Sequence, residues 1–362
     1  MASDSKKQQR VTITQVAAAL GVAVSTVSNA YNRPDQLSEA LRKRILETAA
    51  ELGYAGPQPL ARSLRQQRAG AIGLLFAERL PYVFSDPAAL LLMEGLVQTL
   101  EASNMGLLLI PGRIGHSVAL KNALVDGFVL YALTNTHPLV ELALKRRLPT
   151  VMIDQIATGD AVSILVHDFD GARQAAQHLI DLGHRRFGVI FDRITDQAQG
   201  LRSGASISPL ADLPDTFLAL KRRFEGYAAA FEQAGIDWNQ QLFYECSDNS
   251  EAAGAEAMQA ILHSGQRPTA LLCLTDRLAL GAMEVAQRAG LRIPQDLSIV
   301  GYDDIPAAAQ SRPALTTVQQ DHRAKGRLAG ECLLALLQGD AFEQPDPLIN
   351  SLIVRDSSGP LL

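Results

Sequence analysis

The stretch from Val11 to Tyr31, VTITQVAAALGVAVSTVSNAY, constrains the local fold more than any other part of the sequence. Thr12 followed three residues later by Gln15 is a capping box, which predicts a short helix from Ile13 to about Ala19. A glycine then supplies a tight turn, and a second helix is predicted from Val24 to about Tyr31. The pattern predicts a helix-turn-helix, although a plain helical hairpin on a protein surface would show the same apolar spacing.

The exposed side of the second predicted helix carries side chains that suit a DNA major groove. Asn can bond both N6 and N7 of adenine, a Ser hydroxyl can donate or accept, and Val can contact a thymine methyl group. We expect DNA contacts from Val24, Ser25, Thr26, Ser28 and Asn29.

A third helix and a short basic segment follow. Ser38 is the expected N-cap of a helix from Glu39 to Leu52, and Gly53 is expected to stop it. The next residues, 54–70, read YAGPQPLARSLRQQRAG, which is too short for a domain and too patterned for a passive linker. We therefore predict a hinge there.

Charge is distributed unevenly along the chain. The whole sequence has a net charge of -5, which by itself argues against a nucleic acid partner. Residues 1–70 contain ten Lys or Arg and five Asp or Glu, a balance of +5, so residues 71–362 must carry -10. The N-terminal segment is therefore the predicted polyanion binder, unless its basic residues serve only as solubilising charge.

Cysteine usage and hydropathy indicate the compartment. The three cysteines stand far apart with no CxxC pair, so neither structural zinc nor another metal or cofactor is expected, and a reducing cytoplasm is predicted. The N-terminus lacks the apolar core of an export signal, and no stretch of about 18 apolar residues exists. We therefore expect a cytoplasmic protein with no membrane partner.

From Ala71 onward, short apolar runs alternate with amphipathic helical patterns, which predicts an α/β fold with parallel sheets. The 292 residues after position 70 are too many for one comfortable core, so we expect two subdomains with a ligand cleft between them. Predicted strands cover 71–76, 106–110, 127–132, 150–154, 163–167, 187–191, 242–245, 270–274 and 297–302. Predicted helices include 171–182, 217–234, 251–263 and 278–289, and residues 192–215 are predicted to be a long loop beside the cleft.

Several sequence runs together resemble the lac repressor (LacI/GalR) family of bacterial transcription regulators: TQVAAALGVAVSTVSNAYNRP, LSEALRKRILETAAELGY, PLARSL, TDRLALGAMEVAQRAGLRIPQDLSIVGYDDI and LTTVQQDHRAKGRLAGE. The resemblance covers residues 11–355 apart from 193–215. It implies a helix-turn-helix domain over 1–56, a hinge helix over 57–70, and an effector-binding and dimerisation domain over 71–355. That last domain is expected to hold two Rossmann-like subdomains of the periplasmic-binding-protein type.

The resemblance also implies particular contacts. In the hinge, Arg62 is expected at the DNA and Leu64 is expected to wedge into the minor groove, where unstacking costs a few kcal/mol. The expected effector contacts are Asp154, Arg223, Thr275, Asp276, Asp303, Asn249, Tyr82 and Phe84. Three alternatives stay open: Asp276 could cap the helix that follows it, Asp303 could order its own loop, and the two aromatic residues after the first strand could pack locally.

The expected function is a sequence-specific transcription regulator, most simply a repressor that binds a pseudo-palindromic operator as a homodimer. A sugar or related polyol is favoured as effector, and the alternative is a corepressor-dependent regulator that responds to a nucleobase, nucleoside or other metabolite. No catalytic constellation is present: the histidines lack HExxH spacing and no Gly-rich phosphate loop follows the first strand. A transport-type binding protein would leave the DNA module unexplained, and an architectural DNA protein would leave the cleft domain unexplained.

Overall fold

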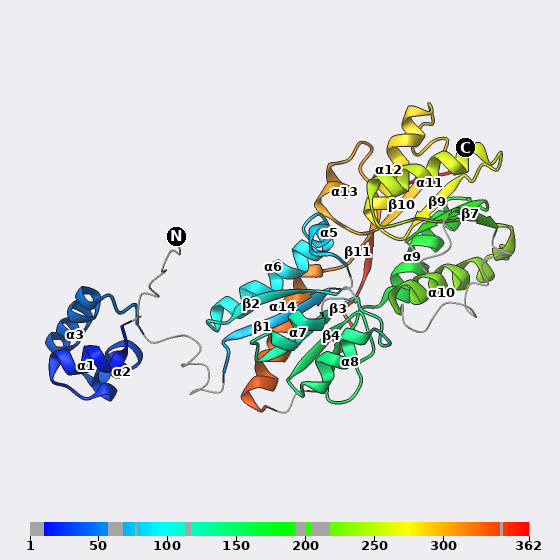
Figure 1. The fold of residues 1–362 in the computed structure, drawn as a ribbon. Helices are drawn as coiled ribbons and strands as arrows, with labels where there is room; N and C mark the ends of the chain where they lie inside the picture. Colours follow the sequence, from blue (N-terminus) through cyan, green and yellow to red (C-terminus); the bar gives the residue numbers. More distant parts are fainter. Residues whose placement is uncertain are drawn as a thin grey trace, which may run out of the picture. The chain divides into compact units, whose positions relative to one another are not determined.

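The computed structural model of the chain describes residues 11–56, 68–76, 78–112, 117–192, 200–203, 218–340 and 343–361. Residue contacts divide the chain into two units, Met1–Ala69 and Gly70–Leu362 (Figure 1). Most of the predicted hinge, including Arg62 and Leu64, lies outside the described residues.

Three helices form the first unit: α1 (Ile13–Leu20), α2 (Val24–Asn32) and α3 (Glu39–Leu52), with the short 3-10 helix η1 (Pro34–Gln36) before α3. The residue after α1 is a glycine in the left-handed conformation, which costs glycine no steric strain, so the chain can turn sharply into α2. Each helix begins where the sequence predicted and ends within one residue of the prediction.

The three helices enclose a small core of Val16, Ala17, Val27, Ala30, Ile45 and Ala49. Leu52, the last residue of α3, is 40% exposed, because the buried core ends one turn earlier. Arg42 donates from Nε to the Ala30 carbonyl oxygen at 3.4 Å. This basic residue therefore joins α3 to the end of α2 as well as adding positive charge.

The N-cap of α2 gives a first testable prediction. Ala23 occupies that position in an extended conformation and makes no side-chain capping bond. Ala23→Ser should supply the missing acceptor and stabilise α2 by about 1 kcal/mol. Hydrogen exchange of the first-turn amides of α2 should slow by roughly fivefold, since 1.4 kcal/mol corresponds to about tenfold. Ala50→Ser, at an exposed position inside α3, is the control and should give no protection; equal protection in both variants would contradict the capping argument.

The second unit contains two sheets built mainly from parallel strands, as the sequence predicted. The first sheet has the order β2-β1-β3-β4-β5 and the second has the order β12-β11-β10-β9-β6-β8-β7. The first sheet consists of β1 (Ala71–Phe76), β2 (Gly106–Pro111), β3 (Gly127–Tyr131), β4 (Thr150–Ile153) and β5 (Val162–Ile164). The second consists of β6 (Phe187–Phe191), β7 (Gly200–Ser203), β8 (Leu242–Glu245), β9 (Ala270–Cys273), β10 (Ser298–Asp303), β11 (Thr316–Gln319) and β12 (Ser351–Ile353).

The five parallel strands of each sheet are arranged in the same order. Numbered along the chain, they lie as second, first, third, fourth and fifth: β2-β1-β3-β4-β5 in the first sheet and β8-β6-β9-β10-β11 in the second. This doubly wound order places a ligand crevice at the carboxyl ends of the strands. In the second sheet, β7 and β12 add antiparallel strands at the two edges.

Helices pack against both sheets in pairs (Figure 1). Those of the first subdomain are α5 (Leu80–Val83), α6 (Pro87–Ala102), α7 (Ser117–Asn122), α8 (Pro138–Lys145) and α14 (His322–Gln338). Those of the second are α9 (Asp168–Asp181), α10 (Leu218–Gln233), the 3-10 helix η3 (Trp238–Gln240), α11 (Glu251–His263), α12 (Asp276–Arg288) and α13 (Pro306–Gln310). The pairs α6 with α14, α9 with α10, and α11 with α12 pack closely. In the first pair, a Cβ at Gly326 would meet the Leu92 carbonyl oxygen, so only glycine permits this approach.

The predicted loop over 192–215 is wrong in one part. Gly200–Ser203 forms the edge strand β7, which pairs with β8, and Arg202 makes a 3.0 Å ion pair with the buried Glu245. A four-residue strand with glycine and serine at its ends carries little apolar signal, so its sequence read as a loop. The flanking residues 193–199 and 204–217 lie outside the described part of the chain.

All three cysteines are buried and unpaired. Among the described residues no single helix is long and apolar enough to span a membrane; α1 and α2 meet that requirement only when taken together across a bend of 110°.

Candidate functional site

A pocket of about 220 Å³ opens between the two subdomains of the second unit. Its walls are built from strand ends: Ala132 follows β3, Asp154 follows β4, Asp192 follows β6, Leu274 follows β9, and Asp303 ends β10. The sequence predicted a ligand cleft between the two subdomains. The other lining residues are Asp86, Ala88, Tyr131, Leu133, Leu218, Ala219, Leu220, Arg223, Asn249, Thr275, Gln320, His322 and Lys325.

The backbone around the pocket holds unusual conformations. Ala132, Asp154 and Asp303 line the pocket and have φ of 51°, 58° and 111°, all in a region that residues with a Cβ rarely adopt. Such conformations cost about 1–3 kcal/mol each and persist where surrounding structure enforces them, often at binding sites. The strain therefore supports a functional role for this pocket.

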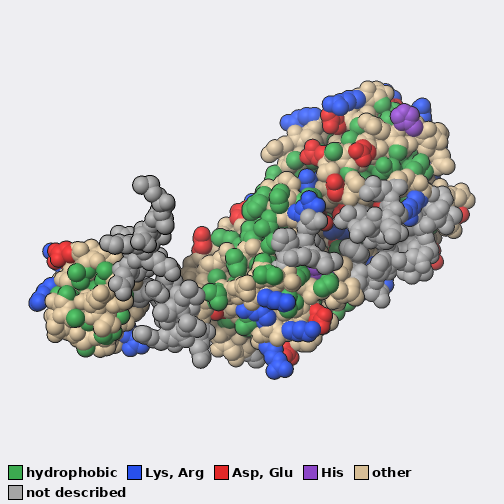
Figure 2. Space-filling model, in the orientation of Figure 1, with side chains coloured by type: hydrophobic (Ala, Val, Ile, Leu, Met, Phe, Trp, Pro, Cys, Tyr) green, Lys and Arg blue, Asp and Glu red, His purple; other side chains and the backbone are tan. Residues whose placement is uncertain are grey.

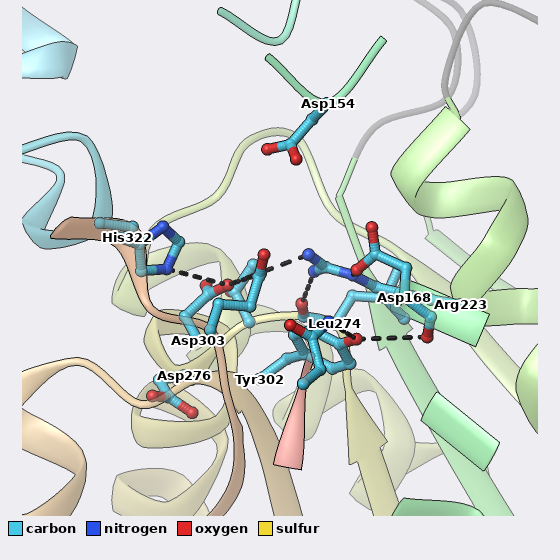
Figure 3. A network of polar contacts seen from close by, with 12 residues as sticks. Asp154, Asp168, Arg223, Leu274, Asp276, Tyr302, Asp303 and His322 are labelled. Carbon is cyan, nitrogen blue, oxygen red and sulfur yellow. Dashed lines mark hydrogen bonds and ion pairs between the residues drawn. The ribbon is translucent and has the colours of Figure 1, made fainter. Parts of the chain in front are cut away.

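Arg223 of α10 lines the pocket and is held from several sides (Figure 3). Its Nε donates to Asp168 Oδ1 at 2.9 Å and its Nη1 donates to the Leu274 carbonyl oxygen at 2.6 Å. The guanidinium also stacks on the Tyr302 ring, 3.8 Å from the ring centroid. Burial alone would lower the pKa of Arg223, but Asp168, Tyr302 and Asp303 raise it overall, so this residue stays charged.

Asp303 lies beside the guanidinium and near the start of α14. Its Oδ1 accepts a 2.7 Å hydrogen bond from Gln320 Nε2 and lies 3.9 Å from Arg223 Nη2. His322, the first residue of α14, places Nε2 3.7 Å from the same oxygen, which exceeds hydrogen-bonding distance. A ligand in the pocket would therefore find Asp303 already oriented.

Asp154 approaches the pocket from the opposite side (Figure 3). Its Oδ2 accepts a 2.7 Å bond from Nζ of Lys325, a lysine of α14 whose side chain is 1% exposed. Its other oxygen, Oδ1, is buried without a hydrogen-bond partner. The lysine thus fixes one carboxylate oxygen and leaves the second available.

Five of the eight predicted effector contacts line one pocket: Asp154, Arg223, Asn249, Thr275 and Asp303. Thr275 and Asn249 also bond to each other, because Thr275 Oγ1 donates to Asn249 Oδ1 at 2.6 Å.

The other three predicted contacts do not line the pocket. Tyr82 instead donates from its hydroxyl to the Asn249 carbonyl oxygen at 3.2 Å, and Phe84 is 57% exposed. Asp276 is fully buried behind the wall, where Oδ2 accepts from the Ile305 amide at 2.9 Å and Oδ1 accepts from Thr317 Oγ1. It does not cap α12, whose N-cap is Thr275.

Asp276 gives a second prediction, based on pH. Burial raises the pKa of Asp276 well above the ordinary carboxyl value, and nearby Asp303 raises it further. The folded chain therefore keeps this proton at pH values where the unfolded chain has released it. Because the folded chain binds this proton more tightly than the unfolded chain, the proton stabilises the fold. That stabilisation is complete below pH of about 4 and is lost as the pH rises through the raised pKa.

Asp276→Asn has no such proton to lose, so its free energy of unfolding relative to wild type should increase with pH. The slope should reach at most about 1.4 kcal/mol per pH unit. Urea denaturation over a pH series measures it, with the exposed Asp160→Asn as control. A difference that stays constant with pH would show that Asp276 is not the titrating group.

The polar pocket residues that were not among the predicted effector contacts include Asp86, Gln320, His322 and Lys325. The last three lie in the run LTTVQQDHRAKG, where β11 ends and α14 begins. That run was recognised only as part of the family resemblance, because β11 is too short and polar to be predicted as a strand. Because β11 was not predicted, Gln320 and His322 could not be found by examining polar residues after the predicted strands.

In the first unit, the start of α2 is open to solvent. Val24 is 42% exposed and Ser25 is exposed, whereas Thr26, Ser28 and Asn29 are half-buried. Asn29 Nδ2 donates to Gln36 Oε1 at 3.2 Å, so η1 helps to orient this side chain. Gln36 was not singled out in the sequence.

The described residues contain no group of three or more His, Cys, Asp or Glu arranged to hold a metal ion. A helix-turn-helix unit joined to an α/β unit with a polar inter-subdomain pocket defines a DNA-binding regulator of the kind that responds to small ligands.

Comparison with known proteins leads to the family. Residues 12–56 match the bacterial regulatory proteins of the lacI family, and residues 176–358 match the periplasmic binding protein-like domain. Over 335 residues, the chain is 39% identical to an HTH-type transcriptional regulator of Mycobacterium tuberculosis, which spans 90% of this chain and 91% of that protein. The chain belongs to the lacI family of bacterial transcription regulators, and its relatives are regulators, not enzymes.

Two solved structures extend the likeness to the whole chain. The lac repressor dimer bound to its operator and the anti-inducer ONPF matches with a TM-score of 0.77 at 25% identity, over 97% of this chain and 100% of that one. The complex of the transcriptional regulator CelR with cellobiose matches with a TM-score of 0.68 at 27% identity, over 96% and 100%.

Proposed function

We propose that this chain is a cytoplasmic repressor that binds a pseudo-palindromic operator as a homodimer and changes its operator affinity when a sugar or related polyol occupies the pocket. The observation that carries the proposal is that one chain contains both a helix suited to the DNA major groove, α2, and a polar pocket lined by strand ends with strained backbone conformations. Its likeness to the operator-bound lac repressor supports the repressor role. Effector binding would shift the two subdomains relative to each other and so alter the hinge.

Exposed hydrophobic side chains support a dimer. Phe84 after α5, Leu90 on α6 and Leu108 on the edge strand β2 are 57%, 42% and 39% exposed. Hydrophobic side chains gather over these elements on the face drawn in Figure 2. Contiguous apolar surface of this kind is typical of protein interfaces, and a second copy of the chain would cover it in a two-fold dimer. Such a dimer presents two reading helices to the two halves of a palindrome.

The test of DNA reading uses Asn29→Ala. We expect operator affinity to fall by about 1–3 kcal/mol, with the preference for the correct base relaxed and with affinity for unrelated DNA little changed. Fluorescence anisotropy at fixed salt, on palindromic DNA from the promoter beside the gene, measures both affinities. Asn32→Ala is the matched control, since Asn32 is an exposed asparagine of α2 that bonds within its own helix. An equal loss on unrelated DNA would make Asn29 a phosphate contact.

The same assay with pooled sugars and pooled nucleosides tests the ligand response. A pool that weakens operator binding contains an inducer, and a pool that strengthens it contains a corepressor. A nucleoside that strengthens binding would favour the corepressor alternative.

A further inference from the structure

The amino-terminal edge of the first sheet carries a cluster of basic side chains, at the opposite end of the strands from the pocket. The strands β1, β3 and β4 begin at this edge, and α7 and α8 end there, because each helix leads back to the start of the next strand. Lys121 lies in the last turn of α7, and Lys145, Arg146 and Arg147 lie at the end of α8. Figure 2 shows Lys and Arg side chains gathered over these two helices.

Arg146 holds the two helix ends together. Its Nη1 donates to the Leu120 carbonyl oxygen at 3.0 Å and to the Ala123 carbonyl oxygen at 2.8 Å, both at the end of α7. The guanidinium also lies over the Phe128 ring, 5.3 Å from the ring centroid. This arginine therefore has a structural role, and it brings Lys121 beside the end of α8.

The other three cations of the cluster differ in what they contact. Lys145 forms a 2.5 Å ion pair with Glu141, one turn earlier in α8. Lys121 and Arg147 are both exposed, and within the described part of the chain neither pairs with a carboxylate. These two side chains are therefore available to an anionic partner.

The other carboxylates of this edge are engaged or lie on the other face of the sheet. Asp126, just before β3, accepts a 2.7 Å hydrogen bond from the Gly70 amide. Glu101 and Asp340 stand at the ends of α6 and α14, and those helices pack on the face of the sheet opposite to α7 and α8. The α7–α8 side of the edge is therefore basic, although the second unit as a whole is acidic.

The backbone at Arg147 is a second, independent observation. Its φ of 52° lies in the left-handed region, which strains a residue with a Cβ. Its amide closes α8 by donating to the Leu144 carbonyl oxygen at 2.9 Å, at the position after a helix where glycine is usual. Glycine would make the same backbone bond with less strain, so the arginine side chain serves a contact outside this fold.

The cluster lies at the edge where the DNA-reading unit is attached. Gly70 is the first residue of the second unit and directly precedes β1, and its carbonyl oxygen accepts from the Gly106 amide at 2.8 Å. Only residues 57–69 separate Gly70 from Gly56, and a chain of that length spans at most about 50 Å when fully extended. One helical turn of DNA is about 34 Å long. The chain therefore keeps this edge near any DNA that the first unit binds.

We propose that Lys121 and Arg147 form a second DNA contact, which binds the phosphate backbone of the same DNA that the helix-turn-helix unit reads. Cations that neutralise phosphates release condensed counterions, so each contact strengthens binding at low salt and makes it more dependent on salt. Such contacts position a protein on DNA and carry no base preference. The inference rests on the DNA binding in the proposed function and is independent of the effector.

The test is fluorescence anisotropy of the full chain over a series of salt concentrations, with the variants Lys121→Gln and Arg147→Gln. Both palindromic and unrelated DNA are used, with flanks of about 10 bp on each side of the palindrome. In the proposed homodimer each variant loses two phosphate contacts, so the slope of log affinity against log salt should become shallower by about 1.8. Affinity at low salt should fall about tenfold on both DNAs. Asn29→Ala, in contrast, should weaken only operator binding.

Arg186→Gln is the matched control, because Arg186 is exposed and directly precedes β6 at the corresponding edge of the second sheet. Its salt slope should equal that of the wild type. Arg147→Lys should keep the wild-type slope. Arg147→Gly should lose DNA affinity as Arg147→Gln does, yet unfold at an equal or higher urea concentration, because glycine relieves the left-handed strain. Unchanged slopes in both glutamine variants, or an equal change in Arg186→Gln, would overturn the inference.

The two DNAs separate this inference from the proposed function. Phosphates are the same in every sequence, so the slopes on unrelated DNA decide the role of Lys121 and Arg147 whether or not an operator is found. A wild type with no preference for any palindrome would contradict the proposed function alone. Specific binding by the wild type, together with unchanged slopes in the variants, would contradict the second DNA contact alone and leave the basic surface for an acidic protein.

Discussion

Arg223→Met should lower the free energy of unfolding by about 3–5 kcal/mol and abolish the effector response. The guanidinium is 11% exposed and is the ion-pair partner of Asp168, whose side chain is 6% exposed. Without it, a buried carboxylate and the Leu274 carbonyl oxygen both lose their donor. Burial already raises the pKa of Asp168, so in the variant Asp168 is expected to take up a proton rather than remain charged.

Arg222→Met is the matched control, because Arg222 is the preceding residue of the same helix and its ion pair with Glu225 is exposed. A surface pair of this kind contributes about 0–1 kcal/mol. Arg223→Lys should recover only part of the loss, since an ammonium lacks the planar fork that bonds Asp168 and Leu274 together. Urea denaturation measures all three variants. A loss below 1 kcal/mol in Arg223→Met would mean that water replaces the guanidinium.

The helices of the first unit were predictable because their signals are local. Gln15 accepts from the Thr12 amide at 2.8 Å, as the capping box requires, and Ser38 accepts from the Leu41 amide at 3.4 Å. A glycine in the left-handed conformation ends both α1 and α3. Each of these contacts joins residues no more than a few positions apart, so short sequence patterns contain all the information needed.

The pocket was predictable as a place but not as a set of atoms. Strand ends identify the sheet edge that faces the cleft, yet Arg223 and Asp168 are 55 positions apart and Asp276 and Thr317 are 41 apart. No local pattern reports such pairings. Asp276 and Asp303 are both acidic residues at the ends of strands, but only Asp303 reaches the pocket.

The difference between these two aspartates lies in the backbone. Asp276 is the first residue of α12, and its helical conformation directs the carboxylate onto Thr317 and the Ile305 amide. Asp303 has φ of 111°, so the chain turns there and its carboxylate meets Gln320 in the pocket. Strained conformations of this kind are imposed by the surrounding fold and cannot be inferred from residue type.

The opposite wall of the pocket supports a second large effect. Lys325→Met should lower the free energy of unfolding by about 3–5 kcal/mol, because the lysine is 1% exposed and its loss leaves Asp154 without an ion-pair partner. Lys145→Met removes an exposed i,i+4 pair with Glu141 and should cost no more than about 1 kcal/mol. Both are measured by urea denaturation of the unliganded protein.

The double variant Lys325→Met with Asp154→Leu decides what that loss means. A buried ion pair adds little net stability because desolvation offsets the attraction, so removing both partners should recover most of the stability lost in Lys325→Met. The double variant should nevertheless lose polyol binding, because it lacks Asp154 Oδ1. That combination would separate the two roles of the pair: Lys325 serves to hold a ligand-binding carboxylate in place, and the fold itself does not require it. Failure of the double variant to regain stability would instead make the Lys325–Asp154 pair a structural link between α14 and the first sheet.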